Sequence, residues 1–213
     1  MLTTIAQNKE KYLSNFRLFA ERQIEKGKTE PPFAYLVPLD QRDLPTASKL
    51  LQILHDGGAE IYEAERSFIA DETNYPANTF IIPLAQPYRA FIKDLMERKA
   101  YPMMTTREGT PDLPYDEASW TLPLQMGVKA IQVTNPFQAE MKQLSKIDRP
   151  QTKFAGKGSN YFFLSNQANN DSILLNRLHK KGVKIHFSEK SFDHEGKIFP
   201  AGTIILDLSL IHI

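Results

Sequence analysis

Cysteine is absent from the 213-residue chain. Its absence excludes disulfide bonds, thiolate nucleophiles and zinc sites built from cysteine ligands. It does not fix the compartment, because secreted bacterial proteins can lack cysteine as well.

An excess of charge of either sign is also missing, since 26 Lys and Arg residues face 25 Asp and Glu residues and the net charge is +1. The chain therefore has no overall field that would attract nucleic acid or an anionic membrane surface. No segment approaches the run of about 18 apolar residues that a membrane span needs. A hydrophobic fraction of 41% is typical of a globular chain with a substantial core.

Residues 1–30 predict an amphipathic linker helix. Ile5, Tyr12, Phe16 and Phe19 recur near helical spacing, and Gly27 with the following prolines predicts its end. Residues 31–213 alternate short apolar strands with helices and form the second predicted domain. This order favours an α/β fold whose parallel strands are joined by crossover helices.

Two parts of the chain repeat each other. Residues 48–82 align without a gap on residues 172–206. The similarity is clear in residues 55–82, "HDGGAEIYEAERSFIADETNYPANTFII", and residues 179–206, "HKKGVKIHFSEKSFDHEGKIFPAGTIIL". The repeated unit is a β-α-β-turn-β segment that spans about residues 33–83 and 160–207. Asn78 and Gly202 occupy the same site in a Pro-Ala turn and are the two residue types that most readily adopt a positive φ. We therefore expect a left-handed residue at both turns and both copies in one sheet.

Trp120 is the single tryptophan and lies among Leu122, Leu124 and Met126. An indole in that setting is expected to be buried.

A histidine and a glutamate have the spacing of a zinc-binding pair. His186 and Glu189 form H-x-x-E, but only His194 and His212 follow as a third ligand, and both are close in sequence. Catalytic zinc needs three protein ligands and one open position. The pattern indicates a solvated strand edge, so we predict no catalytic residue, metal ligand or bound cofactor in this chain.

Polar residues that follow apolar strands are the best candidates for ligand binding. Ligands of parallel sheets bind beyond the carboxyl ends of the strands. The alternative for each side chain is a helix cap or a solvated loop. The candidates, called the rim residues below, are Gln41, Arg42, Gln86, Tyr88, Arg89, Asn166, Gln167 and Asn169.

Three stretches resemble the region that follows the catalytic domain in large bacterial zinc carboxypeptidase-like proteins: "AYLVPLDQRD", "YPANTFIIPLAQPYRAFIKDLMERKAYP" and "PYDEASWTLPLQMGV". The resemblance implies a class I glutamine amidotransferase-like fold, a three-layer α/β/α sandwich with a mostly parallel sheet. It also implies that the zinc and its H-x-x-E ligands lie in a domain upstream of this chain, which is then a fragment. The amidotransferase nucleophile is a cysteine, and this chain has none.

The function implied by the resemblance is that of a non-catalytic accessory domain. Such a domain would contact the upstream catalytic domain, shape substrate access, bind a peptide such as a cell-wall peptide, or form a homodimer. The residues leave two alternatives open: a free-standing small-molecule or peptide-binding α/β module, and a hydrolase of unrecognised type. No nucleic-acid partner and no membrane span are expected.

Overall fold

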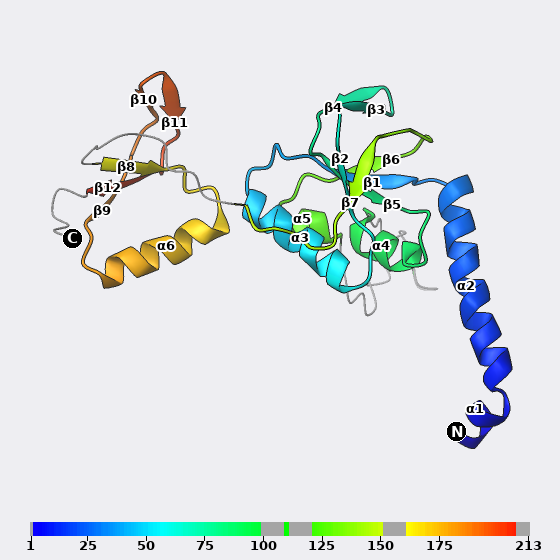
Figure 1. Cartoon of the computed structure of the whole chain (residues 1–213). Helices are drawn as coiled ribbons and strands as arrows, with labels where there is room; N and C mark the ends of the chain where they lie inside the picture. The colour runs from blue at the N-terminus through cyan, green and yellow to red at the C-terminus, as the bar shows by residue number, and fades with distance from the viewer. Residues whose placement is uncertain (1, 99–108, 111–120, 151–160, 208–213) are drawn as a thin grey trace. The chain divides into compact units, whose positions relative to one another are not determined.

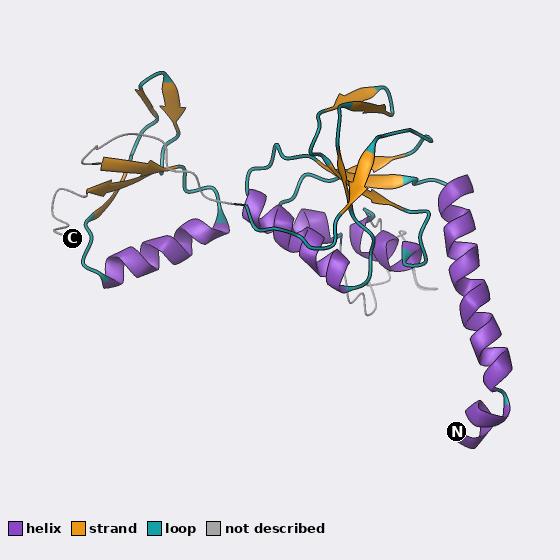
Figure 2. Ribbon diagram, in the orientation of Figure 1, coloured by secondary structure: helices purple, strands orange, loops and turns teal. Residues whose placement is uncertain are grey.

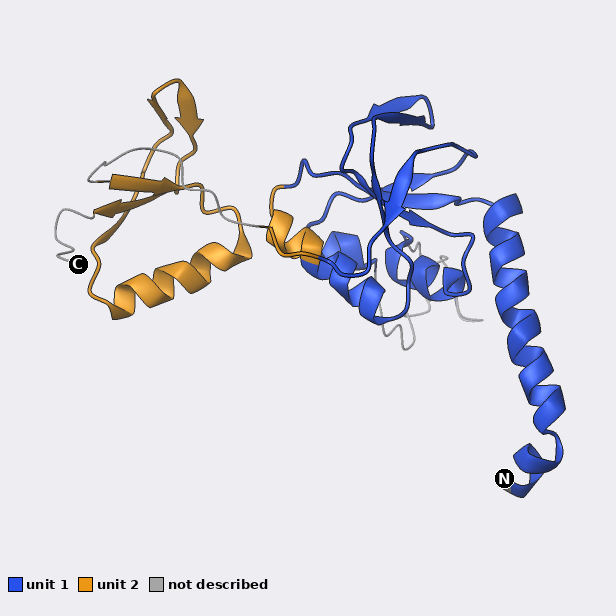
Figure 3. Ribbon diagram, in the orientation of Figure 1, with its two compact units in different colours: residues 1–41, 49–147 blue, residues 42–48, 148–213 orange. Residues whose placement is uncertain are grey.

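The computed structural model describes residues 2–98, 109–110, 121–150 and 161–207. It divides into two compact units, one of residues 1–41 and 49–147 and the other of residues 42–48 and 148–213 (Figure 3). They are called unit 1 and unit 2. Trp120, expected to be buried, lies outside the described residues.

Unit 1 begins with two helices, α1 (Leu2–Gln7) and α2 (Lys9–Thr29). α2 ends at Thr29, just before the prolines that, with Gly27, predict its end, and Gly27 itself lies inside the helix. Gly27 instead allows close packing, since a Cβ atom there would lie 1.9 Å from the carbonyl oxygen of Leu84. Only glycine fits this position without a shift of the backbone.

The sheet of unit 1 has five strands in the order β6-β1-β5-β2-β7. Every neighbouring pair among them is antiparallel. The strands are β1 (Ala34–Val37), β2 (Tyr62–Ala64), β5 (Phe80–Pro83), β6 (Ile131–Val133) and β7 (Met141–Gln143).

Helices lie on one face of this sheet and a β-hairpin lies on the other (Figures 1 and 2). The helices are α3 (Leu44–Asp56), α4 (Arg89–Met96) and α5 (Leu122–Met126). The hairpin, called the arm below, consists of β3 (Phe68–Ala70) and β4 (Thr73–Tyr75). Its Phe68 stacks on Tyr75 and on Phe137, with ring centroids 5.6 and 5.7 Å apart. These rings cover the buried Leu36 and Ile81 of the sheet.

The expected three-layer sandwich with a mostly parallel sheet is therefore wrong, and the protein is a mixed α+β fold with small antiparallel sheets. The β1-α3-β2 segment does give two strands that run in the same direction, because each is antiparallel to β5. The sequence pattern missed the arm, which reverses the chain and returns β5 between β1 and β2. An alternation of strands and helices cannot distinguish adjacent parallel strands from a split β-α-β arrangement.

Unit 2 has the same order of elements as the first part of unit 1. They are β8 (Tyr161–Leu164), α6 (Asn169–Lys180), β9 (Ile185–Phe187), β10 (Phe192–His194), β11 (Lys197–Phe199) and β12 (Ile204–Asp207). The strand order β8-β12-β9 matches β1-β5-β2, so the copies form two sheets rather than the single sheet expected.

The two copies also share their strand register. Tyr62 pairs with Ile81 in unit 1, and His186 pairs with Ile205 at the same positions in unit 2. The positive φ expected at the repeated turn is confirmed at 64° for Asn78 and 83° for Gly202. The buried hydroxyl of the next threonine closes each turn by donating to the proline carbonyl, over 2.8 Å from Thr79 to Pro76 and 2.7 Å from Thr203 to Pro200.

The arm of unit 1 is fastened by one carboxylate. Asp71 lies at the arm's turn with a φ of 44° and accepts hydrogen bonds from the backbone and side chain of Thr134 (2.7 and 3.0 Å) and of Asn135 (both 2.9 Å). Burial alone would raise the pKa of Asp71, but these hydrogen bonds outweigh it and hold the pKa below its usual value.

Replacing Asp71 with Asn removes this pH-dependent contribution. A carboxyl group with a lowered folded-state pKa stabilises the fold above its unfolded-state pKa of about 3.9, and that contribution is lost as the pH falls through the folded-state value. We expect Asp71→Asn to lower the free energy of unfolding at pH 7 by about 1 kcal/mol. The gap to the wild type should narrow toward pH 3.

Urea denaturation at pH 7, 5 and 3 measures this gap. The matched control is Glu72→Gln on the same turn, because Glu72 is exposed and should follow the wild type. A constant gap between Asp71→Asn and the wild type across this pH range would contradict the role given to Asp71.

Candidate functional site

The rim residues do not share one rim. Because β1 and β5 are antiparallel, the residues after β1 and those after β5 lie at opposite ends of the sheet. Gln41 therefore lies away from Gln86, Tyr88 and Arg89 within unit 1. Arg42, Asn166, Gln167 and Asn169 belong to unit 2. The premise of one common rim is thus wrong for the four candidates in unit 1, while ligand binding by any single residue stays a prediction.

Gln86 and Gln41 hold the backbone together. The buried Gln86 side chain accepts from the N–H of Glu60 over 2.7 Å and donates to the carbonyl of the same residue over 3.1 Å. Gln41 makes the equivalent pair with Lys129, at 2.9 and 2.8 Å. Each side-chain amide thereby bonds both backbone groups of one residue outside the strands, Glu60 or Lys129, as a neighbouring strand would. This is a structural role.

Tyr88 lies just before α4 and covers Gly58, where an added Cβ atom would meet its ring at 2.7 Å. This contact, together with the φ of 92° at Gly58, explains why glycine follows α3.

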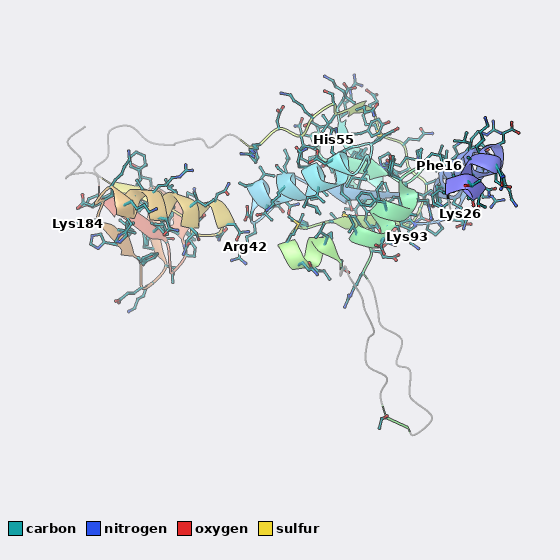
Figure 4. The ribbon with its side chains drawn as sticks, turned by 90° about the horizontal axis from the view of Figure 1, so that it is seen from below. Phe16, Lys26, Arg42, His55, Lys93 and Lys184 are labelled. Atoms are coloured by element: carbon teal, nitrogen blue, oxygen red, sulfur yellow. The ribbon has the colours of Figure 1, made fainter. Side chains whose placement is uncertain are left out.

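Asn169 in unit 2 shares a carboxylate with the start of α3. Asp43 accepts from the backbone N–H of Asn169 (2.8 Å), and from the N–H (3.0 Å) and hydroxyl (2.7 Å) of Thr46. Burial raises the pKa of Asp43, but these bonds and the charge of Arg42 leave it below the usual value. Arg42 itself is exposed (Figure 4). Asp43 thus caps the start of α6 and the start of α3, whose residues 44–48 are grouped with unit 2.

Asn166 and Gln167 follow β8 in exposed positions. Asn166 has a φ of 55°, and its amide donates to the carbonyl of Gly202 over 3.3 Å. Asn166 therefore connects the end of β8 to the repeated turn.

The strongest candidate site surrounds the remaining rim residue, Arg89. Arg89 is the first residue of α4 and is 7% exposed, and Tyr35 on β1 is 2% exposed. Among the residues that the structure describes, neither the Nε of Arg89 nor the hydroxyl of Tyr35 has a hydrogen-bond partner, although the Arg89 Nη2 donates to the carbonyl of Pro31 over 3.4 Å. Buried polar atoms without a partner are rare in folded proteins and call for an explanation.

Electrostatics connect these two residues with Glu97 after α4. Burial raises the pKa of the Tyr35 hydroxyl, the charge of Glu97 raises it further, and the charge of Arg89 lowers it. Tyr35 therefore stays protonated at neutral pH and acts as a hydrogen-bond donor rather than an acid or base. Glu97 is paired with Lys93 over 3.3 Å. The cluster thus contains two buried donor groups, the Nε of Arg89 and the hydroxyl of Tyr35.

Sequence reasoning found Arg89 but missed Tyr35 and Glu97. The available signal was a tyrosine inside the otherwise aliphatic strand "AYLV", because a buried tyrosine normally requires a partner for its hydroxyl.

His186 and Glu189 are both exposed, on β9 and just after it. Among the described residues, no three His, Asp or Glu side chains form a group that could hold a metal ion. No helix within those same residues is long and apolar enough to cross a membrane. Comparisons with protein-family models, with curated proteins and with solved structures found no match to this chain.

Removing the Tyr35 hydroxyl tests whether it lacks a partner in solution. We expect Tyr35→Phe to leave the free energy of unfolding unchanged or to raise it by up to about 1 kcal/mol, because a buried hydroxyl without a partner is costly. Chemical denaturation measures the change.

The control is Tyr62→Phe, which removes a bond of 2.9 Å to Glu60 and should lower the free energy of unfolding slightly. A loss above about 1 kcal/mol for Tyr35→Phe would show that the hydroxyl has an acceptor, such as water or a ligand.

Proposed function

We propose that this chain is a non-catalytic accessory domain of a zinc carboxypeptidase-like protein. The proposal rests on the three stretches that carry the sequence resemblance. Two of them supply β1, β5 and α4 of unit 1, and β1 pairs with β5. The third supplies Thr121, whose hydroxyl donates to the carbonyl of Glu97 over 2.8 Å. Residues of all three stretches thus lie near Tyr35, Arg89 and Glu97, which supports the view that the stretches belong to one folded module.

In this proposal, the accessory domain uses α2 to contact the rest of the zinc carboxypeptidase-like protein, which is called the parent protein below. Phe16, labelled in Figure 4, is 77% exposed on this helix. Four other large apolar side chains of α2 are exposed as well: Tyr12, Leu13, Leu18 and Phe19. Gly27 fixes the far end of the same helix to unit 1. A cluster of exposed apolar side chains is typical of a protein contact. The resemblance places the catalytic domain before α2, and we assign that domain as the partner.

Binding between the two parts tests this assignment. The parent's catalytic domain and the present chain are produced as separate polypeptides, and their association is measured by calorimetry. We expect the double variant Leu13→Ser and Phe16→Ser to weaken binding at least tenfold, because truncation of apolar anchors dominates interface energies.

The matched control is Arg17→Ser, which removes only an exposed ion pair with Glu21 and should bind as the wild type does. Unchanged affinity in the double variant, or no association with the catalytic domain at all, would overturn the proposed contact.

Arg89 and Tyr35 support a second candidate function, that of a free-standing module for a small carboxylate. Both donors are buried, and their Nε and hydroxyl groups have no partner within the described part of the chain. A carboxylate could accept from both. Tyr35→Phe and Arg89→Leu should then abolish binding of such a ligand, whereas the accessory role predicts that neither affects contact through α2.

The accessory role also predicts how the isolated chain behaves with zinc. We expect no stoichiometric zinc site of submicromolar affinity, and no carboxypeptidase or glutaminase activity. Zinc requires three protein ligands, and His186 and Glu189 are exposed on one short edge of unit 2. Calorimetric titration with zinc, run beside both activity assays, checks this. Stoichiometric binding that His186→Ala abolishes would restore the H-x-x-E pair as a working site.

A further inference from the structure

One edge of the unit 2 sheet differs from its counterpart in unit 1. In unit 1, β2 lies between β5 and β7. Its counterpart β9 pairs with β12 on one side, and within residues 161–207 no strand pairs with its other side. The pairing of β2 with β7 is therefore a template for a strand added to this second side of β9, which is called the open edge below.

Backbone groups along β9 alternate between its two sides. The N–H of Ser188 donates to Thr203 in the β12 direction over 2.9 Å, as Ala64 does to Thr79 in unit 1. The outward groups in unit 1 belong to Ile61 and Glu65, which bond to Leu144 and Glu140 over 2.9 Å. Their counterparts are Ile185 and Glu189, 124 positions later. Antiparallel alternation thus directs Ile185, Phe187 and Glu189 toward the open edge.

Two side chains at this edge define what an incoming strand must carry. Glu63 of β2 faces Lys142 of β7, but its counterpart Phe187 is apolar and 56% exposed. Arg66 forms an ion pair with Glu140 over 3.3 Å, and its counterpart Lys190 keeps the positive charge. A strand in the β7 register would therefore place an acidic residue near Lys190 and, two positions later, an apolar residue opposite Phe187.

We propose that β9 binds an extended peptide of a partner protein by antiparallel strand addition. The peptide takes the register of β7 on β2 and reads acidic-x-apolar from its N-terminal side. Backbone hydrogen bonds hold the strand, and Phe187 and Lys190 select the sequence. The inference rests on the internal repeat and not on the family resemblance, so it can fail while the accessory role stands.

A second copy of the chain fits this edge less well. Antiparallel pairing of β9 with itself about Phe187 brings Ile185, rather than an acidic residue, to the position that faces Lys190. A three-residue edge also buries far less than the roughly 1,600 Å² of a standard interface. A short peptide needs no such area, because strand addition obtains its affinity from the main chain.

The test uses a fluorescent peptide copied from residues 138–145 with the substitution Lys142→Phe, titrated into the whole chain. We expect saturable binding, with hydrogen exchange at Phe187 and Glu189 slowed by the peptide. Phe187→Ser and Lys190→Glu should each weaken binding roughly three- to tenfold, as lost cross-strand contacts do. Phe187→Glu should reverse the preference, favouring the peptide that retains Lys142.

The control is Ile198→Ser on β11, which is exposed in the same unit and should bind the peptide as the wild type does. No saturable binding at millimolar peptide would overturn the proposal, as would equal affinities for wild type, Phe187→Ser and Lys190→Glu. Sedimentation tests the remaining occupant. The open edge would be assigned to a second copy if the chain forms a dimer that Phe187→Ser dissociates and that the peptide does not displace.

Discussion

In each unit, the last strand of the repeat pairs between the two strands that precede it: β5 lies between β1 and β2, and β12 lies between β8 and β9. The rest of the fold depends on this pairing. Once β5 lies between β1 and β2, the helix that connects those strands must cross one face of the sheet. The hairpin that reverses the chain is left on the opposite face, where Phe68 covers the buried residues of the sheet. The Pro-Ala turn makes this return possible because Asn78 or Gly202 supplies the left-handed backbone and a buried threonine closes the loop.

Local chemistry could be predicted from the sequence, while the order of the strands could not. The repeat, the positive φ at Asn78 and Gly202, and the helices that end before Gly57 and Gly182 all follow from short-range preferences. The direction of β5 depends on a hairpin whose turn, Asp71-Glu72, contains neither glycine nor asparagine, so its sequence gave no type I′ signal. The packing role of Gly27 could not be predicted for a related reason, because it lies in a contact with Leu84, far along the chain.

The candidate site shows the same limit. The rim residues were chosen by their places after strands, and most of them hold the local backbone, as Gln86 does for Glu60. Arg89 differs because its buried Nε has no partner in the described ranges, and its charge acts on the buried Tyr35 hydroxyl. That distinction depends on which residues lie together across the sheet and α4, and no spacing in a single sequence encodes it. The same is true of β9, whose open edge is recognised only by comparison with β2.

The arm of unit 1 has a counterpart in unit 2, the hairpin of β10 and β11, which is called the second arm. The two arms stabilise their turns differently, and this affects the order in which the chain can fold during synthesis. Glu195-Gly196 uses a glycine for one of its two left-handed residues, so the second arm contains what its turn needs. Asp71-Glu72 places two non-glycine residues there, each at a cost of about 1 kcal/mol, and is held by Thr134 and Asn135. On the ribosome, the first arm is completed only after about 60 further residues have emerged, whereas the second can close as soon as it leaves the tunnel.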